Sequence, residues 1–198
     1  MFNSEKINET ILRLTKLPGI TKKTAEKIIY WILESSEQEV NLLANSFKSL
    51  KDDILFCQMC TAPLFANHEC SVCNDQTREN KLLIVESLQI MQKIEKAKFY
   101  KGKYFVFRKK LLSETIINKE MNLINELITY ARTFDEVIFG ISPNMDGEIT
   151  KHVLRKFLEK LNLNLTELAV GLPVGSSVDY IDEITLKLSL ENRKITPK

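Results

Sequence analysis

The stretch Cys57-Gln-Met-Cys60, followed after nine residues by Cys70-Ser-Val-Cys73, contains every cysteine of the 198-residue chain. Two Cys-x-x-Cys pairs can place four thiolates at the corners of a tetrahedron, which is the geometry of a structural Zn²⁺ site. We therefore predict that Cys57, Cys60, Cys70 and Cys73 bind structural zinc. Because four thiolates complete the shell, His68 within the stretch is expected not to be a ligand. The alternatives are two disulfides or free thiols.

The composition is that of an ordinary soluble protein, with 44% hydrophobic and 27% charged residues. No apolar run approaches the roughly 18 residues of a membrane helix. The N-terminal residues Met1-Phe-Asn-Ser-Glu-Lys6 lack the basic and apolar blocks of a signal peptide. We expect a cytoplasmic, nucleoid-associated protein that does not contact a membrane.

The net charge of +2 is unevenly distributed along the chain. Residues 81–110 carry nine Lys or Arg against two Asp or Glu, a net +7, whereas the segments on either side are slightly acidic. Such a block is a candidate surface for nucleic acid. The alternative is that it is only a solvated face, which is the commoner meaning of a run of charges.

Two short helices are predicted near the N-terminus, joined by Leu17-Pro-Gly-Ile20. Apolar residues at helical spacing predict the first helix over residues 7–16 and the second from Thr21 to about Ser35. The proline ends the first helix, the glycine permits a backbone angle that other residues resist, and the threonine can cap the second helix. This arrangement resembles a helix-hairpin-helix DNA-binding motif.

In such a hairpin, the exposed N–H groups at the start of the second helix can bind a phosphate. Phosphate contacts position DNA without reading its sequence. The residues predicted to bind DNA in this way are Gly19, Thr21, Lys22, Lys23 and Lys27. The family pattern usually has a second glycine where Thr21 stands, and the alternative is an ordinary turn in a helical bundle.

A third helix is predicted from the capping box Ser36-x-x-Glu39. We expect it to pack on the first two helices through a buried apolar face. The residues of that face are Val40, Leu43, Ala44, Phe47 and Leu50.

From residue 82 onward the pattern alternates between short apolar runs and amphipathic segments. This alternation predicts an α/β layer with a mostly parallel sheet. The strands are expected at 82–85, 104–107, 137–139 and 168–170, with helices after residue 87 and over 119–132 and 148–161.

Three carboxylates follow these strands, at the edge where α/β sheets commonly carry their sites. Glu86 follows the first strand, and Asp146 and Glu148 follow the third. The pattern resembles a Toprim domain, whose enzymes hold Mg²⁺ with such carboxylates. A vestigial Mg²⁺ site and a partner contact are both open for this acidic edge. The alternative for Asp146 and Glu148 is that they are solvated or stabilise a helix start.

Taken together, these features resemble the RecR family of bacterial recombination mediators over nearly the whole chain. Beside the hairpin and the cysteines, the resemblance rests on Val85-Glu-Ser87, Asp146-Gly-Glu148 with Thr150, Gly171-Leu-Pro-Val-Gly175, Tyr180-Ile-Asp-Glu183, Thr185-Leu186 and Leu190-Glu-Asn-Arg-Lys194. One departure is Arg108-Lys-Lys-Leu-Leu-Ser-Glu114, which replaces a Gly-rich Leu-Ser-Pro loop of the family. Taken alone, Gly171–Gly175 reads as a turn with a rigid proline.

The resemblance implies a multidomain α+β and α/β protein. Its parts would be a helix-hairpin-helix domain (1–56), a Cys₄ zinc finger (57–80), a Toprim-like domain (81–170) and a C-terminal tail in subunit contacts (171–198). It implies a non-enzymatic DNA-repair protein that forms a dimer or a tetrameric ring. Such proteins bind DNA independently of sequence and act with RecO, and sometimes RecF, at single-stranded gaps. A Mg²⁺-dependent nuclease or strand-joining enzyme is the second hypothesis, and a scaffold that never touches DNA is the third.

Overall fold

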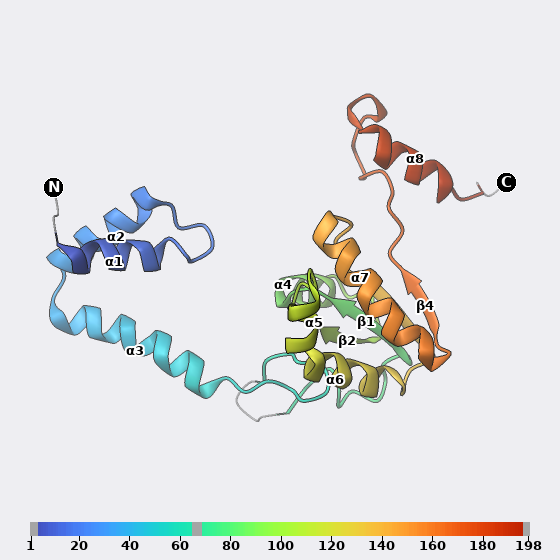
Figure 1. Ribbon diagram of the computed structural model, residues 1–198, viewed down its shortest axis with the longest axis horizontal. Helices are drawn as coiled ribbons and strands as arrows, with labels where there is room; N and C mark the ends of the chain where they lie inside the picture. The colour runs from blue at the N-terminus through green and yellow to red at the C-terminus, as the bar shows by residue number, and fades with distance from the viewer. Residues whose placement is uncertain (1–3, 65–68, 196–198) are drawn as a thin grey trace. The chain divides into compact units, whose positions relative to one another are not determined.

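The computed structural model describes residues 4–64 and 69–195. The chain divides into two compact units, Met1–Ile54 and Leu55–Lys198 (Figure 1). The first unit holds the helices α1 (Glu5–Leu14), α2 (Lys22–Glu34) and α3 (Glu37–Asp53). The three predicted N-terminal helices are thus confirmed, with ends that differ by a few residues.

Helices α1 and α2 pack against each other around two buried side chains of α2, Ala25 and Ile29. The capping box that opens α3 is confirmed. The backbone N–H of Glu39 donates to the Ser36 hydroxyl at 3.3 Å, and the backbone N–H of Ser36 donates to the Glu39 carboxylate at 3.0 Å. Two N–H groups of the first turn are therefore satisfied locally.

The predicted burial of the α3 apolar face is wrong for the single chain. Helix α3 has no buried residue, and Phe47 on that face is 66% exposed. The reason is that periodicity marks a face that favours burial but does not say what covers it. Within its own unit, α3 finds too little apolar surface to cover that face.

The second unit is built on a four-stranded parallel sheet with the strand order β2-β1-β3-β4. The strands are β1 (Lys81–Val85), β2 (Lys103–Val106), β3 (Glu136–Gly140) and β4 (Asn164–Glu167). Residues 82–85 of β1 are all buried, as expected of a central strand covered on both faces. The predicted α/β layer is confirmed.

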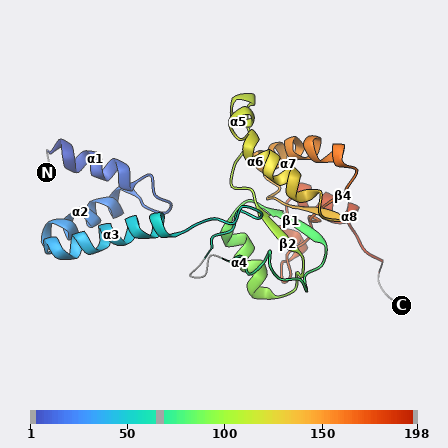
Figure 2. The ribbon, with the colours of Figure 1, turned by 90° about the horizontal axis from the view of Figure 1, so that it is seen from below.

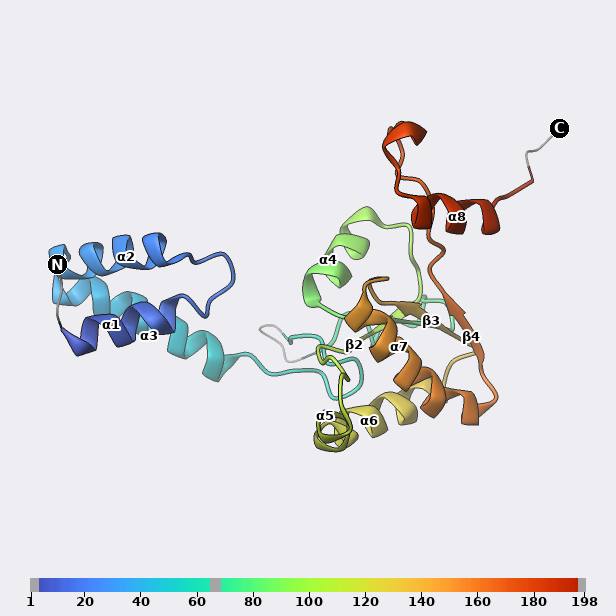
Figure 3. The ribbon, with the colours of Figure 1, turned by 45° about the horizontal axis from the view of Figure 1, so that its top comes forward.

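Helices cover both faces of this sheet. Helix α4 (Leu88–Ala97) lies on one face, and α6 (Met121–Ala131) and α7 (Met145–Leu158) lie on the other (Figures 2 and 3). Strand β2 lies on one side of β1, and β3 and β4 lie on the other. Because the crossovers are right-handed, the helix before β2 and the helices after it therefore cover opposite faces. The core consists of buried side chains from strands and helices, among them Phe105, Phe139, Ile124 and Leu154.

Two details of the α/β layer differ from the prediction. The last strand was expected at 168–170 because of its apolar residues, but β4 occupies Asn164–Glu167. No residue of β4 is buried, so the strand can be polar and its position is not marked by an apolar run. The sequence also failed to reveal α5 (Glu114–Lys119), a short helix capped by the Ser113 side chain.

The C-terminal tail after β4 contains a 3₁₀ turn η2 (Val178–Tyr180) and the helix α8 (Glu183–Glu191). The expected turn is present: Gly175 has φ +85°, and the N–H of Ser176 donates to the carbonyl of Pro173 at 3.2 Å. Helix α8 has no buried residue, and Tyr180 is 90% exposed. Among the described residues, no helix is long and apolar enough to cross a membrane.

Candidate metal centre and nucleic-acid interface

The four cysteines converge into one cluster. Their sulfur atoms all lie within 4.8 Å of one another. The closest pairs are Cys60 with Cys70 at 3.5 Å and Cys57 with Cys73 at 3.9 Å, too far apart for the roughly 2.05 Å of an S–S bond. All four thiols are free. The arrangement fits a four-coordinate soft metal ion and leaves no ligand position open.

The loop between Cys57 and Ala62 holds the first pair of thiols in a tight turn. The N–H of Cys57 donates to the carbonyl of Ala62 at 2.8 Å, and the N–H of Thr61 donates to the carbonyl of Cys57 at 2.9 Å. Thr61 closes this turn with φ +57°. Cys57 and Cys60 are buried as a result.

The close approach of the sulfurs shifts the pKa values of Cys60 and Cys70 in opposite directions. The hydrogen bond between these two side chains, 3.5 Å long, raises the pKa of Cys60 and lowers the pKa of Cys70. The backbone N–H of Cys73 also points at the Cys70 sulfur, at 3.4 Å. Such N–H donors stabilise thiolate charge, which is the form that binds metal.

Residues of β2 and α6 form hydrogen bonds with the cysteine segment. The N–H of Val106 donates to the carbonyl of Cys60 at 3.0 Å, and the Thr61 hydroxyl donates to the carbonyl of Val106 at 2.6 Å. On the other side, the Lys103 ammonium donates to the carbonyl of Cys73 at 2.8 Å. The cluster is therefore part of the folded α/β unit and not an independent knuckle.

Tyr130 of α6 reaches the cluster itself, and sequence reasoning missed it. Its hydroxyl lies 3.4 Å from the Cys73 sulfur. Its ring packs edge-on against Phe134 with the ring centres 4.9 Å apart. Burial raises the pKa of Tyr130, so the phenol stays protonated and can donate to a thiolate. No local motif marks such a residue, because it lies far from the cysteines in the sequence. His68 lies outside the described residues.

The hairpin at residues 15–21 has the geometry that its sequence predicts. Gly19 has φ +78°, in the left-handed region that favours glycine. Thr21 has φ −81° and ψ 164°, an extended conformation that a threonine adopts without strain. Its hydroxyl accepts from the N–H of Thr24 at 3.3 Å and so caps α2. The replacement of the second glycine therefore does not disturb the turn.

The predicted phosphate contacts of the hairpin lie together at the start of α2. Lys22, Lys23 and Lys27 are exposed, and none forms an ion pair with any residue that the structure describes. The first turn of α2 has no acidic residue. Positive side chains thus add to the partial positive charge of a helix N-terminus, which favours an anion there.

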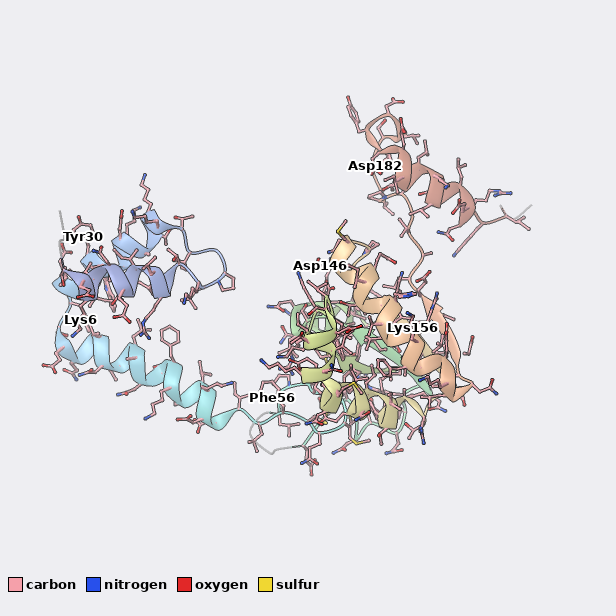
Figure 4. The ribbon with its side chains drawn as sticks, viewed as in Figure 1. Lys6, Tyr30, Phe56, Asp146, Lys156 and Asp182 are labelled. Atoms are coloured by element: carbon pink, nitrogen blue, oxygen red, sulfur yellow. The ribbon has the colours of Figure 1, made fainter. Side chains whose placement is uncertain are left out.

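The predicted acidic edge is engaged in separate contacts. The Ser142 hydroxyl and N–H both donate to Glu86. Asp146, at the start of α7 (Figure 4), pairs with Lys110 at 2.8 Å, and Glu148 pairs with Lys151 at 2.9 Å. In the part of the chain that is described, only the four cysteines form a group of three or more metal-ligand side chains.

At this acidic edge, the backbone at the start of α7 passes close to the backbone of Ser142. A Cβ atom at position 147 would overlap the carbonyl of Ser142, so Gly147 is required there. Its N–H donates to the side chain of Asn144, which caps α7, at 2.9 Å. The side chain of Thr150 accepts from the N–H of Leu111 at 3.1 Å and ties α7 to the loop after β2.

The atypical loop 108–114 is anchored by its own basic residues. Arg108 stacks over the ring of Phe56 at 4.3 Å and donates to the carbonyl of Thr61 (Figure 4 labels Phe56). Lys109 pairs with Glu120 at 3.2 Å. Leu111 is fully buried. Packing and ion pairs thus hold the loop in place.

Comparison with known proteins identifies the class. A family model described as "RecR, helix-hairpin-helix" matches residues 7–50, and one described as "RecR, C-terminal" matches residues 171–194. The recombination protein RecR of Mycoplasmopsis pulmonis is 42% identical over 189 residues, which cover 95% of this chain and 97% of that protein. The RecR proteins of Lactococcus lactis subsp. lactis and Carboxydothermus hydrogenoformans are 34% and 32% identical, over 98% of this chain in each case.

The hairpin, the cysteine cluster and the α/β layer therefore define a protein of DNA recombination and repair. The chain belongs to the RecR family.

Proposed function

We propose that this protein is a non-enzymatic recombination mediator that binds DNA independently of sequence. It acts with a RecO-type protein, and with a RecF-type protein as a further partner, at single-stranded gaps. The observation that carries the DNA-binding role is the start of α2, where Lys22, Lys23 and Lys27 are exposed and form no ion pair with any described residue. Membership of a recombination family supports the repair role. The site of action is the cytoplasm, at the nucleoid.

The cysteine cluster binds structural Zn²⁺ through Cys57, Cys60, Cys70 and Cys73. The four thiols fit this ion in number, spacing and burial, and the N–H of Cys73 and the phenol of Tyr130 offset part of the thiolate charge. When bound, the ion crosslinks two chain segments and supplies no reactive position. Its binding contributes to the folding free energy of the second unit.

The active form is a homo-oligomer, either a dimer or a tetrameric ring. The support is apolar surface that a single chain leaves uncovered on α3 and on the C-terminal tail. Patches of this kind usually mark protein–protein contacts. A ring would allow DNA to pass through without reading its sequence.

The acidic edge serves as a partner contact and not as a catalytic centre. Glu86, Asp146 and Glu148 each have a neighbouring partner of their own, and two of these partners are lysines. A phosphodiester-cleaving Mg²⁺ site needs carboxylates that converge on one point. The engagement of the three carboxylates supports the non-enzymatic proposal.

A loading assay tests this proposal. The zinc-loaded protein and its RecO-type partner are added to gapped DNA coated with single-strand-binding protein, and the appearance of recombinase filaments is followed. The proposal predicts filament formation only with both proteins, and intact strands on a denaturing gel at every Mg²⁺ concentration. Strand cleavage or joining that Glu86→Ala abolishes would establish the enzyme instead, and loading without this protein would remove the mediator role.

A further inference from the structure

The positive block at residues 81–110 is only partly used by the fold. Five of its nine cations are engaged within the unit. Three of them form ion pairs: Lys81 with Glu79 and Glu136, Lys109 with Glu120, and Lys110 with Asp146. The other two donate to backbone carbonyls, Lys103 to that of Cys73 and Arg108 to that of Thr61. These five cations therefore already have partners within the unit.

The other four cations gather at one end of α4. Lys93, Lys96, Lys98 and Lys101 are exposed, and no ion pair joins them to a described residue. They run from the second half of α4 to the start of β2 (Figure 1). A helix C-terminus carries only about half a negative charge, so one cation would suffice to complement it.

Glu95 lies within this group, and the backbone N–H of Glu79 donates to the carbonyl of Lys101 at 2.9 Å, but both carboxylates have cations of their own. The Arg78 guanidinium holds Glu95 in two hydrogen bonds, at 2.9 and 2.8 Å. The Glu79 carboxylate lies 3.4 Å from the Lys81 ammonium. Among the described residues, these four lysines between positions 93 and 101 therefore have no ion-pair partner.

An exposed aromatic ring lies among these lysines. Phe99 is 74% exposed, directly after the left-handed residue Lys98 that ends α4 with φ +57°. Its neighbour Tyr100 is instead bound into the fold, since its hydroxyl donates to the Lys81 carbonyl at 3.1 Å. Because most of the Phe99 side chain is not packed into the fold, its ring is accessible to a ligand.

We propose that residues 93–101 form a second DNA-contacting surface that binds single-stranded DNA. The lysines contact phosphates, and Phe99 stacks on an unpaired base. Single-strand binders combine cations that follow the backbone with aromatic rings on which bases stack, whereas the base faces of a duplex are covered. This inference rests on the proposed DNA-binding function, to which it adds a second site and a preference for unpaired strands.

The test is equilibrium binding of the zinc-loaded full chain to a labelled oligo-dT and to a duplex of equal length. Phe99→Leu keeps the apolar volume but removes the ring, and we expect it to weaken oligo-dT binding about tenfold while duplex binding is unchanged. Phe99→Trp should restore the affinity. The triple variant Lys93→Gln/Lys96→Gln/Lys98→Gln should reduce the slope of log K against log salt on oligo-dT by about 2.

The matched control Lys119→Gln/Lys156→Gln/Lys160→Gln removes the same charge from exposed positions elsewhere in the unit. For this control, the slope of log K against log salt on oligo-dT should stay near that of the unchanged protein. Equal loss in the control and the α4 triple variant, or an unaltered affinity in Phe99→Leu, would overturn the proposed surface. If only Lys22→Gln/Lys23→Gln reduces binding, the hairpin alone holds DNA and this inference fails while the proposed function stands. If the unchanged protein binds neither DNA, both fail.

Photo-crosslinking to an oligonucleotide that contains 5-iodouracil gives an independent reading. Mass spectrometry should find the crosslink on the tryptic peptide Phe99–Lys101. Crosslinks confined to the hairpin peptides would contradict the proposal.

Discussion

At the scale of single residues, the Cys73 sulfur joins two parts of the molecule that are distant in sequence. It is one of the four thiols of the cluster, and it lies 3.4 Å from the phenol of Tyr130 on α6. The same residue accepts from Lys103 of β2 through its carbonyl. Loss of metal from the cluster is therefore expected to disturb the edge of the sheet as well as the loop.

Replacement of one ligand tests the metal centre. Cys57→Ser should lower the zinc content from about one ion per chain to near zero, because an incomplete shell binds the ion far less tightly. The second unit should also unfold at a lower temperature. Metal analysis and thermal unfolding measure both effects, with Ser71→Ala as the control within the same loop. Normal zinc content in Cys57→Ser would contradict the ligand assignment.

The Tyr130 hydroxyl can be removed while its ring stays. Tyr130→Phe should speed the transfer of zinc to a chromogenic chelator about tenfold, since partners that donate to metal ligands typically contribute that much affinity. Tyr100→Phe is the control, because it removes the hydroxyl of a partly buried tyrosine that contacts backbone carbonyls and no thiol. Equal transfer rates for the two variants would show that the Tyr130 contact does not hold the metal.

At the scale of elements, the hairpin and the capped helices were predictable because their signals are local. Gly19, the Thr21 cap and the Ser36 capping box each act within a few residues of themselves. The same holds for the buried runs of β1 and β2. The position of β4 was not predictable, because its sequence is mostly polar and none of its residues is buried. The burial of α3 also depends on what covers it, which periodicity cannot reveal.

The left-handed turn at Gly19 makes a testable contribution to the first unit. Gly19→Ala should destabilise that unit by about 1 kcal/mol and weaken DNA binding, because alanine resists φ +78° although no atom would clash with its Cβ. Chemical denaturation followed through Trp31 measures the loss. Gly171→Ala is the control, since that position is equally open but has no left-handed φ. A neutral Gly19→Ala would contradict the strained-turn account of the hairpin.

The open face of α3 gives a prediction about assembly. Phe47→Asp should shift the protein toward monomers in mass photometry, because it places a charge on apolar surface that the oligomer is expected to bury. Asn45→Asp adds the same charge about 200° away around the helix and should leave the assembly unchanged. Identical mass distributions for the two variants would argue against α3 as a subunit contact.

Across the whole molecule, the net charge is only +2, but the positive side chains are unevenly distributed and differ in whether they have partners. Lysines at the start of α2 and toward the end of α4 form no ion pair with a described residue, whereas the basic loop 108–114 is held by internal contacts. The charge of a segment could be counted from the sequence, but which cations stay free could not. That distinction depends on partners such as Glu120 and Asp146, which only the fold brings near.

The convergence of the four cysteines is the feature of the candidate site that the sequence predicted best. Two Cys-x-x-Cys pairs specify four ligands almost by themselves. Tyr130, by contrast, reaches the cluster from α6, and Arg108 contacts Phe56 across the loop. Such contacts depend on tertiary packing, so no spacing in the sequence could have revealed them.

The salt dependence of DNA binding most directly tests whether the hairpin binds the phosphate backbone of DNA. A labelled gapped duplex is titrated with the zinc-loaded protein and with Lys22→Gln/Lys23→Gln at several salt concentrations. The account predicts affinity that falls steeply with salt in the unchanged protein, and weaker binding with a slope smaller by about 2 in the variant. Circular dichroism confirms that the variant is folded. If both proteins show the same affinity and the same slope of log K against log salt, the hairpin does not bind the phosphate backbone.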